Sequence, residues 1–128
     1  MNKTITITRS LALRPERGEE GKIIVVKGAR VGKHYPVRPW EKILIGRDET
    51  QCDIVIPTNT VTRVHCEVYY DPGRKMYVVT DMSKNGIILN NEFLLPKNKE
   101  CDVAPGSTLM IGSTQDIIVL DHPDDHTA

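Results

Sequence analysis

The sequence predicts an all-β fold, a sandwich or barrel of many short strands. From Lys22 onward, runs rich in β-branched residues follow one another closely, and Gly, Pro, Asn or Asp separates them. No stretch long enough for a helix has its apolar residues at helical spacing. The runs that carry this prediction are GKIIVVKG, KHYPV, EKILIGR, CDIVIP, VHCEVYY, KMYVVTD, NGIILN, STLMIGS and QDIIVLD.

The turns between these runs can be assigned from their residues. Asp71-Pro72-Gly73 favours a reverse turn and predicts a hairpin between VHCEVYY and KMYVVTD. Asn85-Gly86 and Pro105-Gly106 are turn dipeptides of the same kind. Within VHCEVYY, the alternation of a strand sends Cys66 and Val68 to the core.

Composition limits the class of partner. The chain has 128 residues, 39% of them hydrophobic, which suits one globular domain. Its 17 basic and 17 acidic residues give a net charge of zero. No overall field would attract nucleic acid or a membrane, so any anion must be recognised by a local cluster of positive groups.

The cysteines and the N-terminus favour a cytoplasmic protein without a cofactor. Cys52, Cys66 and Cys101 are odd in number and lack metal-ligand spacing, which favours reduced thiols and predicts neither metal nor cofactor. MNKTITITRS lacks the apolar stretch of a signal peptide, and no run reaches the roughly 20 apolar residues of a membrane span.

The chain divides into three parts. Residues 1–20 are expected to form a flexible arm, residues 21–121 the folded domain and residues 122–128 a disordered tail. Thr4, Thr6 and Thr8 of the arm alternate as in an added edge strand. A second hypothesis is that one of them is phosphorylated and binds back to its own domain, favoured by high effective concentration.

Polar loop residues gather in three separate segments. They are Gly46-Arg47 at the end of a strand, Thr62–His65 before one, and Asp81–Gly86 after another. Loops at one edge of a sandwich lie together and commonly carry function.

These segments resemble the forkhead-associated (FHA) domain family over about Lys22 to Leu120. The matching pieces are Gly46-Arg47, Thr62-Arg63-Val64-His65, Asp81-Met82-Ser83-Lys84-Asn85-Gly86 and Asn90. The resemblance implies a sandwich of about eleven strands that binds phosphothreonine peptides at one edge. It therefore predicts an interaction module and not an enzyme.

Physical chemistry supports the phosphate assignment residue by residue. A phosphothreonine carries about −1.5 to −2 charges, and the planar fork of Arg47 suits its oxygens. Thr62 replaces the family's usual serine and keeps the donating hydroxyl. Arg63 is expected to add charge. Asn85, by the resemblance, contacts the ligand's main chain, which its amide can do as both donor and acceptor.

The remaining site residues are expected to support or modify these contacts. Lys84 stands where many family members have Thr, and it either adds charge or faces solvent. Gly46 and Gly86 are expected to support the loops, since glycine permits turn conformations that a side chain resists. By the resemblance, His65, expected within a strand, ties the loops together. Ile87, also a departure from the family, is expected to affect packing.

Simpler interpretations accompany each assignment. Arg47 could pair with Asp48 or Glu49 on the surface, and Arg63 and Lys84 could be solvated charges. Asn85 could serve only as a turn former, although the same turn would still present its amide.

Two alternative functions follow. The domain could be a degenerate FHA scaffold that binds a protein independently of phosphate, an alternative that the departures at Thr62 and Lys84 leave open. It could instead be a small hydrolase using Cys66 or His65, although strand neighbours point to opposite faces and could not act together.

The expected partner is a threonine-phosphorylated protein, such as a Ser/Thr kinase or its substrate, bound by a monomer. By the resemblance, specificity depends on the third residue after the phosphothreonine. The loop 57–61 and the stretch after Asn85 are expected to form the pocket for it. The sequence names neither the partner nor the preferred residue.

Overall fold

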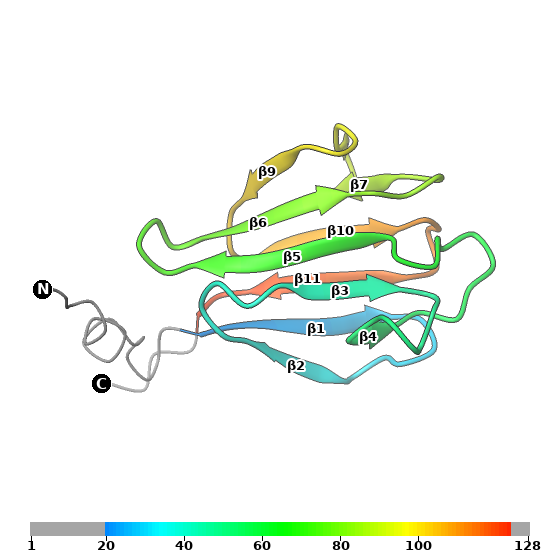
Figure 1. The fold of residues 1–128 in the computed structure, drawn as a ribbon, viewed down its shortest axis with the longest axis horizontal. Coiled ribbons are helices and arrows are strands. Elements are labelled where there is room, and N and C mark those ends of the chain that lie inside the picture. The colour runs from blue at the N-terminus through cyan, green and yellow to red at the C-terminus, as the bar shows by residue number, and fades with distance from the viewer. Residues whose placement is uncertain (1–19, 124–128) are drawn as a thin grey trace, which may run out of the picture.

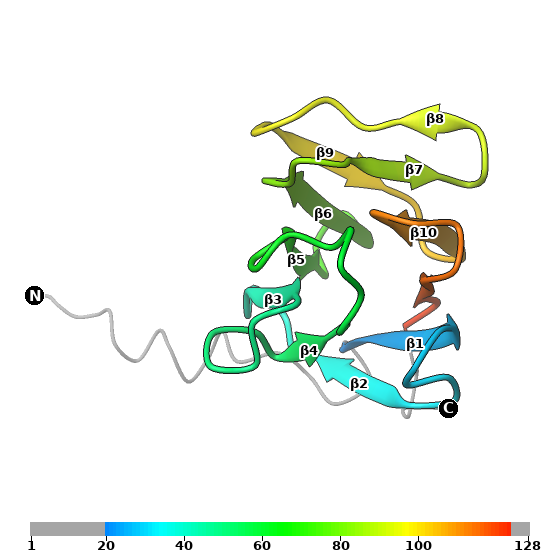
Figure 2. The ribbon, with the colours of Figure 1, turned by 90° about the vertical axis from the view of Figure 1, so that its right-hand side faces the viewer.

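The computed structural model describes residues 20–123, which form two β-sheets packed face to face (Figures 1 and 2). Eleven strands make up the two sheets, and no helix occurs in the described range, so none there could cross a membrane. The predicted all-β sandwich is confirmed.

One sheet has six strands and the other has five. The six-stranded sheet runs, in spatial order, β2 (His34–Val37), β1 (Gly21–Lys27), β11 (Ile117–Asp121), β10 (Ser107–Ile111), β7 (Ile87–Leu89) and β8 (Phe93–Leu94). The five-stranded sheet runs β4 (Ile54–Val55), β3 (Ile43–Gly46), β5 (Cys66–Asp71), β6 (Met76–Asp81) and β9 (Glu100–Val103). Neighbouring strands are antiparallel except β3 and β4, which are parallel.

Side-chain alternation places the core between the sheets. In β1, Ile23 and Val25 are buried while the residues between them are partly exposed. In β5, Cys66 and Val68 are fully buried, as the alternation predicted. Complete burial of an aliphatic side chain of this size stabilises a fold by about 1.5–3 kcal/mol, so these two-faced strands hold the sheets together.

The predicted turn at Asp71 closes the β5–β6 hairpin. The Asp71 carboxylate accepts hydrogen bonds from the backbone N–H of Gly73 at 3.0 Å and of Arg74 at 3.2 Å. Its other oxygen accepts from Nε of Arg74 at 2.8 Å. Asp71 therefore supplies the local side-chain-to-backbone bonds that stabilise a turn.

Antiparallel pairing brings four loops to one end of the sandwich. Because β3, β5 and β6 pair antiparallel in that order, Gly46, Cys66 and Asp81 lie at the same end. In the six-stranded sheet, Ile111 pairs with Ile87, so the end of β10 lies beside the start of β7. The loops after β3, before β5, after β6 and after β10 therefore meet, at the right-hand side of Figure 1.

Tyr77 links the two sheets at the opposite end. Its ring is fully buried beside Tyr70, with ring centroids 5.1 Å apart. Its hydroxyl donates to the carbonyl of Asp121 in β11 at 2.6 Å and accepts from the N–H of Lys22 in β1 at 2.8 Å. A side chain of the five-stranded sheet thus satisfies two backbone groups of the other sheet.

Removing the Tyr77 hydroxyl should destabilise the fold. We expect Tyr77→Phe to lower the free energy of unfolding by about 1–3 kcal/mol, because the partners it leaves are partly buried. Urea unfolding measures the change. The matched control is Tyr35→Phe, since the hydroxyl of half-buried Tyr35 has no hydrogen bond to the described residues. Equal losses in the two variants would contradict the inter-sheet role of Tyr77.

Candidate functional site

Gly46 allows the loop before β5 to lie directly against the end of β3. A Cβ at this position would overlap the carbonyl oxygen of Arg63 and lie 2.9 Å from the nitrogen of His65. The next two backbone N–H groups, of Arg47 and Asp48, donate to the carbonyls of Thr62 and Arg63 at 3.1 and 3.0 Å. Glycine is therefore required here for close approach of two backbones.

The Arg47 side chain is held by one of its three nitrogens. Its Nε donates to the carbonyl of Val61 at 2.9 Å. The two terminal nitrogens have no hydrogen bond or ion pair with any residue in the range 20–123. The alternative interpretation, a pairing with Asp48 or Glu49, is not present within residues 20–123, and the guanidinium keeps donors for an external anion.

His65 joins the loops of the site through both nitrogens of its ring. The backbone N–H of Thr62 donates to Nδ1 at 3.0 Å, and Nε2 lies 2.9 Å from the carbonyl of Gly86. Because Nδ1 accepts, the neutral ring carries its proton on Nε2 and donates it to Gly86. Burial lowers the pKa of His65, so the ring stays neutral.

The expectation that His65 lies within a strand is wrong by one residue. β5 begins at Cys66, and His65 stands just outside it. Its backbone N–H still bonds the carbonyl of Ile45 at 2.8 Å, and its carbonyl accepts from the N–H of Met82 at 2.8 Å. A ring just outside the ladder can turn toward the loops, which a ring inside the ladder could not do as freely.

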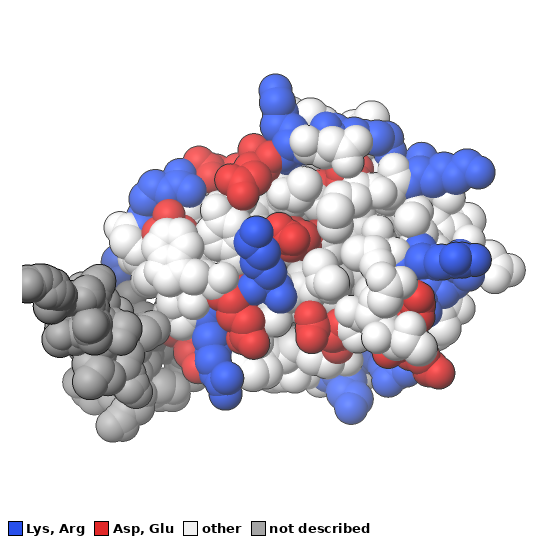
Figure 3. Space-filling model, viewed as in Figure 1, with Lys and Arg blue, Asp and Glu red and all other residues white. Residues whose placement is uncertain are grey.

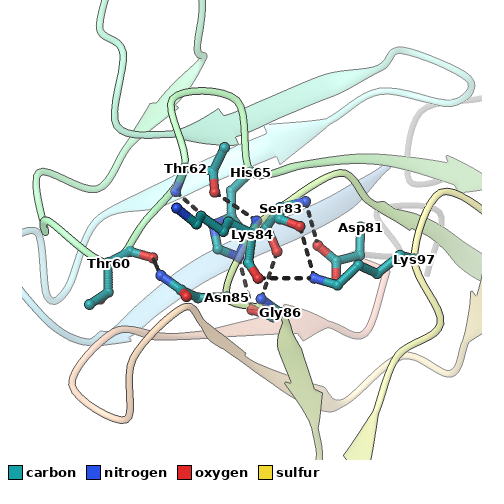
Figure 4. Close-up of polar contacts among 9 residues, drawn as sticks. All are labelled: Thr60, Thr62, His65, Asp81, Ser83, Lys84, Asn85, Gly86 and Lys97. Carbon is teal, nitrogen blue, oxygen red and sulfur yellow. Dashed lines mark hydrogen bonds and ion pairs between the residues drawn. The ribbon is translucent and has the colours of Figure 1, made fainter.

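The hydroxyl of Thr62 faces Lys84. Oγ1 accepts the backbone N–H of Lys84 at 3.0 Å (Figure 4). A hydroxyl that accepts in this way keeps its own hydrogen for donation. The loops on the two sides of the site are thereby joined at the residue that is expected to donate to a ligand.

The Asn85–Gly86 turn presents the Asn85 amide toward the loop before β5. Its Nδ2 donates to the carbonyl of Thr60 at 2.8 Å, while Oδ1 has no partner among the described residues. Gly86 has φ 87°, in the left-handed region that favours glycine. Its N–H donates to Oγ of Ser83 at 2.7 Å, which closes the turn.

The Lys97 side chain stabilises the Asn85–Gly86 turn through the two residues that precede it. Its Nζ donates to the carbonyls of Ser83 and Lys84 at 2.8 and 3.3 Å, and lies 3.9 Å from the carboxylate of Asp81 (Figure 4). Asp81 is fully buried, and its other oxygen accepts the N–H of Ser83 at 2.9 Å. One ammonium group thus satisfies two carbonyls and places a counter-charge near the buried carboxylate, whose Oδ2 makes no hydrogen bond within residues 20–123.

The sequence did not lead to Lys97 or to Gly112. Gly112, after β10, has φ 66°, and its N–H donates to the carbonyl of Gly86 at 3.1 Å. A Cβ there would lie 2.7 Å from the carbonyl oxygen of Thr60 and 2.8 Å from the His65 ring. The only available signal was a glycine directly after the strand STLMI, which marks many ordinary turns.

All five residues predicted to contact phosphothreonine line one open hollow of about 360 Å³. Three further residues of the loop before β5 line it as well. The full lining is Arg47, Asn59, Thr60, Val61, Thr62, Arg63, Lys84 and Asn85. The predicted support residues lie beneath: Gly46, His65 and Gly86 are buried.

The hollow carries positive charge and no carboxylate. Arg47, Arg63 and Lys84 are exposed, and none belongs to any of the four ion pairs formed within residues 20–123. Basic side chains project from this end of the molecule, with acidic ones below them (Figure 3). The local cluster that a neutral protein needs to hold an anion is therefore present.

Cys66 and His65 do not form a hydrolytic pair. The Cys66 thiol is fully buried, and burial raises its pKa, which opposes formation of a thiolate. Both ring nitrogens of His65 bond backbone groups of the loops. Residues 20–123 also contain no group of His, Cys, Asp and Glu that could hold a metal ion.

Comparison with known proteins identifies the family. Residues 43–112 match the family model of the FHA domain. The chain belongs to the FHA domain family. The matched region contains all eight residues that the sequence assigned to the site or its support, and the resemblance drawn from the sequence is confirmed.

Relatives known by sequence are much longer proteins. Angiogenic factor with G patch and FHA domains 1 from Mus musculus is 29% identical over 100 residues, which cover 73% of this chain and 14% of that protein. Probable serine/threonine-protein kinase fhkC from Dictyostelium discoideum is 30% identical over 83 residues, covering 62% of this chain and 12% of that protein. The chain thus spans only a small part of either relative.

Solved FHA domains share the fold. That of an Arabidopsis thaliana hypothetical protein has a TM-score of 0.74 at 23% identity, covering 85% of this chain and 90% of that one. The MEK1 FHA domain, solved with a phosphothreonine peptide of HOP1, has a TM-score of 0.67 at 20% identity. It covers 81% of this chain and 97% of that one.

The stability of this FHA domain should depend on pH through His65. The unfolded imidazole titrates near pH 6.5, whereas burial lowers the pKa in the fold. As the pH falls below about 6.5, His65 becomes protonated in the unfolded state but stays neutral in the folded state. The free energy of unfolding therefore falls with pH until the folded pKa is reached. This contribution is complete above about pH 6.5.

Nuclear magnetic resonance titration of the imidazole signals measures this shift. The His65 signal is assigned by its absence from a His65→Gln variant. We expect it to titrate below the usual range for histidine. A His65 signal that titrates at or above the usual value would contradict burial as the dominant influence on its pKa and the role of Nδ1 as an acceptor.

Removing the Lys97 ammonium should loosen the Asn85–Gly86 turn. We expect Lys97→Met to lower the free energy of unfolding by about 1 kcal/mol, because the site is half exposed and the buried Asp81 loses its counter-charge. Amide hydrogen exchange of Gly86 should quicken as well. Lys99→Met, which removes an exposed lysine two residues away, is the matched control and should leave both quantities unchanged.

Proposed function

We propose that this FHA domain is an interaction module that binds threonine-phosphorylated segments of partner proteins, with no bond made or broken. The observation that carries the proposal is the single hollow in which the cations, the hydroxyl and the amide meet. They come from three loops, which follow β3, precede β5 and follow β6, and hydrogen bonds join these loops to one another. A partner in kinase signalling, either a Ser/Thr kinase or its substrate, would supply the phosphothreonine.

The free atoms of the site match the chemistry of the ligand. The terminal nitrogens of Arg47 and the hydroxyl hydrogen of Thr62 are donors, and phosphate oxygens only accept at their ionised positions. Asn85 keeps Oδ1 and one N–H, which suit an N–H and a C=O of an extended main chain. Relatives with solved complexes, such as the MEK1 FHA domain with its phosphothreonine peptide, support the same ligand class.

The expected affinity is moderate. A few charge-assisted hydrogen bonds at about 1.5–3 kcal/mol each can produce micromolar binding, near −8 kcal/mol in total. An unphosphorylated peptide lacks the acceptors for most of them. The binding energy therefore depends on the phosphate, and the domain would release its partner when a phosphatase acts.

Calorimetric titration with paired phosphorylated and unphosphorylated peptides tests the proposal. We expect micromolar binding of the phosphorylated peptide only. Arg47→Ala should weaken it by about tenfold to hundredfold, the equivalent of one charge-assisted contact. Thr62→Val should also weaken it, whereas Thr62→Ser, which keeps the hydroxyl, is the matched control and should bind nearly as well as the original.

Two outcomes would count against the proposal. Equal binding of both peptides would favour a scaffold that ignores phosphate. Unchanged affinity in Arg47→Ala would mean that the phosphate lies elsewhere on the domain.

A further inference from the structure

The hollow carries more positive charge than one phosphate neutralises. Its lining contains three cations and no carboxylate, and none of the three has an ion pair within the described part of the chain. A phosphothreonine brings about −1.5 to −2 charges. About one positive charge is therefore left without a counter-charge when the phosphate is bound.

The three cations are arranged around one residue. The backbone N–H of Arg47 donates to the carbonyl of Thr62, Arg63 is its chain neighbour, and the backbone N–H of Lys84 donates to its hydroxyl. The Lys84 side chain extends from its turn toward the segment Thr60–Thr62 (Figure 4). A phosphate held by Thr62 would consequently be surrounded by cations from separate loops.

Two of these three cations have no hydrogen-bonding role within the described part of the fold. The guanidinium of Arg47 is fixed by its bond to Val61. The side chains of Arg63 and Lys84, in contrast, make no hydrogen bond within residues 20–123 and contribute only their charge. Long exposed side chains of this kind can reach past the phosphate to a neighbouring group of the ligand.

One acid close in sequence to the hollow, Asp48, already has partners of its own. Asp48, next to Arg47, is occupied by Thr50 and Gln51, whose hydrogen bonds hold its pKa down at about 2. Its charge also acts on Arg63 from outside the hollow. Lys84 forms no ion pair within residues 20–123, so its charge stays available on the side of the Asn85–Gly86 turn.

We propose that the hollow prefers a phosphothreonine with a second anionic group close to it in the ligand chain, received mainly by Lys84 and secondarily by Arg63. This inference rests on the proposed function and names its substrate class. An extended peptide advances about 3.3 Å per residue. A lysine side chain beside the phosphate therefore reaches groups within about two residues of the phosphothreonine.

Two kinds of ligand carry the required charge. One has an aspartate or glutamate beside the phosphothreonine, and the other has a second phosphorylated residue there. Both present oxygens to the same cations, but the second carries more charge and more acceptors. The test must separate them.

Four peptides of one length provide the test, measured by calorimetric titration at low and physiological salt. The first has a phosphothreonine among alanines, the second adds glutamates within two positions, the third adds a phosphoserine there instead, and the fourth has the glutamates with unphosphorylated threonine. We expect the second peptide to bind about fivefold tighter than the first, as an ion pair at a partly exposed site allows. The third should bind tighter still, and the advantage should shrink with salt.

Substitutions show which cation causes the tighter binding of the second peptide. Lys84→Gln should remove most of the advantage of the second peptide over the first, and Arg63→Gln a smaller part of it. The matched control is Lys75→Gln, which removes an exposed lysine from the β5–β6 turn at the far end of the sandwich. It should leave the advantage intact, since the charge lies beyond the reach of the bound peptide.

The outcomes separate this inference from the function on which it rests. Failure of the second peptide to outbind the fourth, which is its unphosphorylated form, would remove the proposed function and this inference with it. Tight binding of the first peptide with no gain in the second or third would overturn this inference alone. An equal gain in Lys84→Gln and Lys75→Gln would also overturn it, because the preference would then come from the overall field of the protein.

Discussion

The neutral imidazole of His65 is the interaction on which the arrangement of this FHA domain's binding edge depends. Its Nδ1 accepts from Thr62 and its Nε2 donates to Gly86, so one ring fixes the spacing of two loops. Its own backbone is bonded to Ile45 and Met82, which ties the same point to β3 and to the end of β6. The bond to Gly86 is buried and the bond from Thr62 is partly buried, and in such surroundings hydrogen bonds are strong and an unmade one is costly.

As a consequence, each side chain that faces the hollow uses its polar atoms for two different purposes. Arg47, Thr62 and Asn85 each use one atom for a bond inside the domain, to Val61, from Lys84 and to Thr60 respectively. Each keeps another polar atom for the hollow. Side chains oriented in this way lose little freedom on binding, so more of the contact energy remains as affinity.

The sequence led to the fold and to the residues that line the hollow, because both leave local signals. Strand runs show β-branched alternation, and the turn at Asn85–Gly86 shows its dipeptide. The contacts of Lys97 leave no such signal, and the close packing of Gly112 leaves only a glycine after a strand, since their partners lie far away in the sequence. The placement of His65 inside a strand failed because the alternation of VHCEVYY does not show where the ladder begins. The arm with Thr4, Thr6 and Thr8 lies outside the described residues.

Two of the three departures from the usual FHA pattern meet in a single hydrogen bond. Thr62 replaces serine, Lys84 replaces threonine, and the backbone N–H of Lys84 donates to the Thr62 hydroxyl. A threonine has fewer accessible χ1 rotamers than a serine, because its Cβ carries two heavy atoms. The bond from Lys84 fixes the oxygen in one of them and leaves the hydroxyl hydrogen to the hollow. The methyl group therefore does not cost the site its donor, and the departure at Lys84 adds a cation beside it. Together these substitutions are compatible with a site that offers a hydroxyl donor and a cation to an anion.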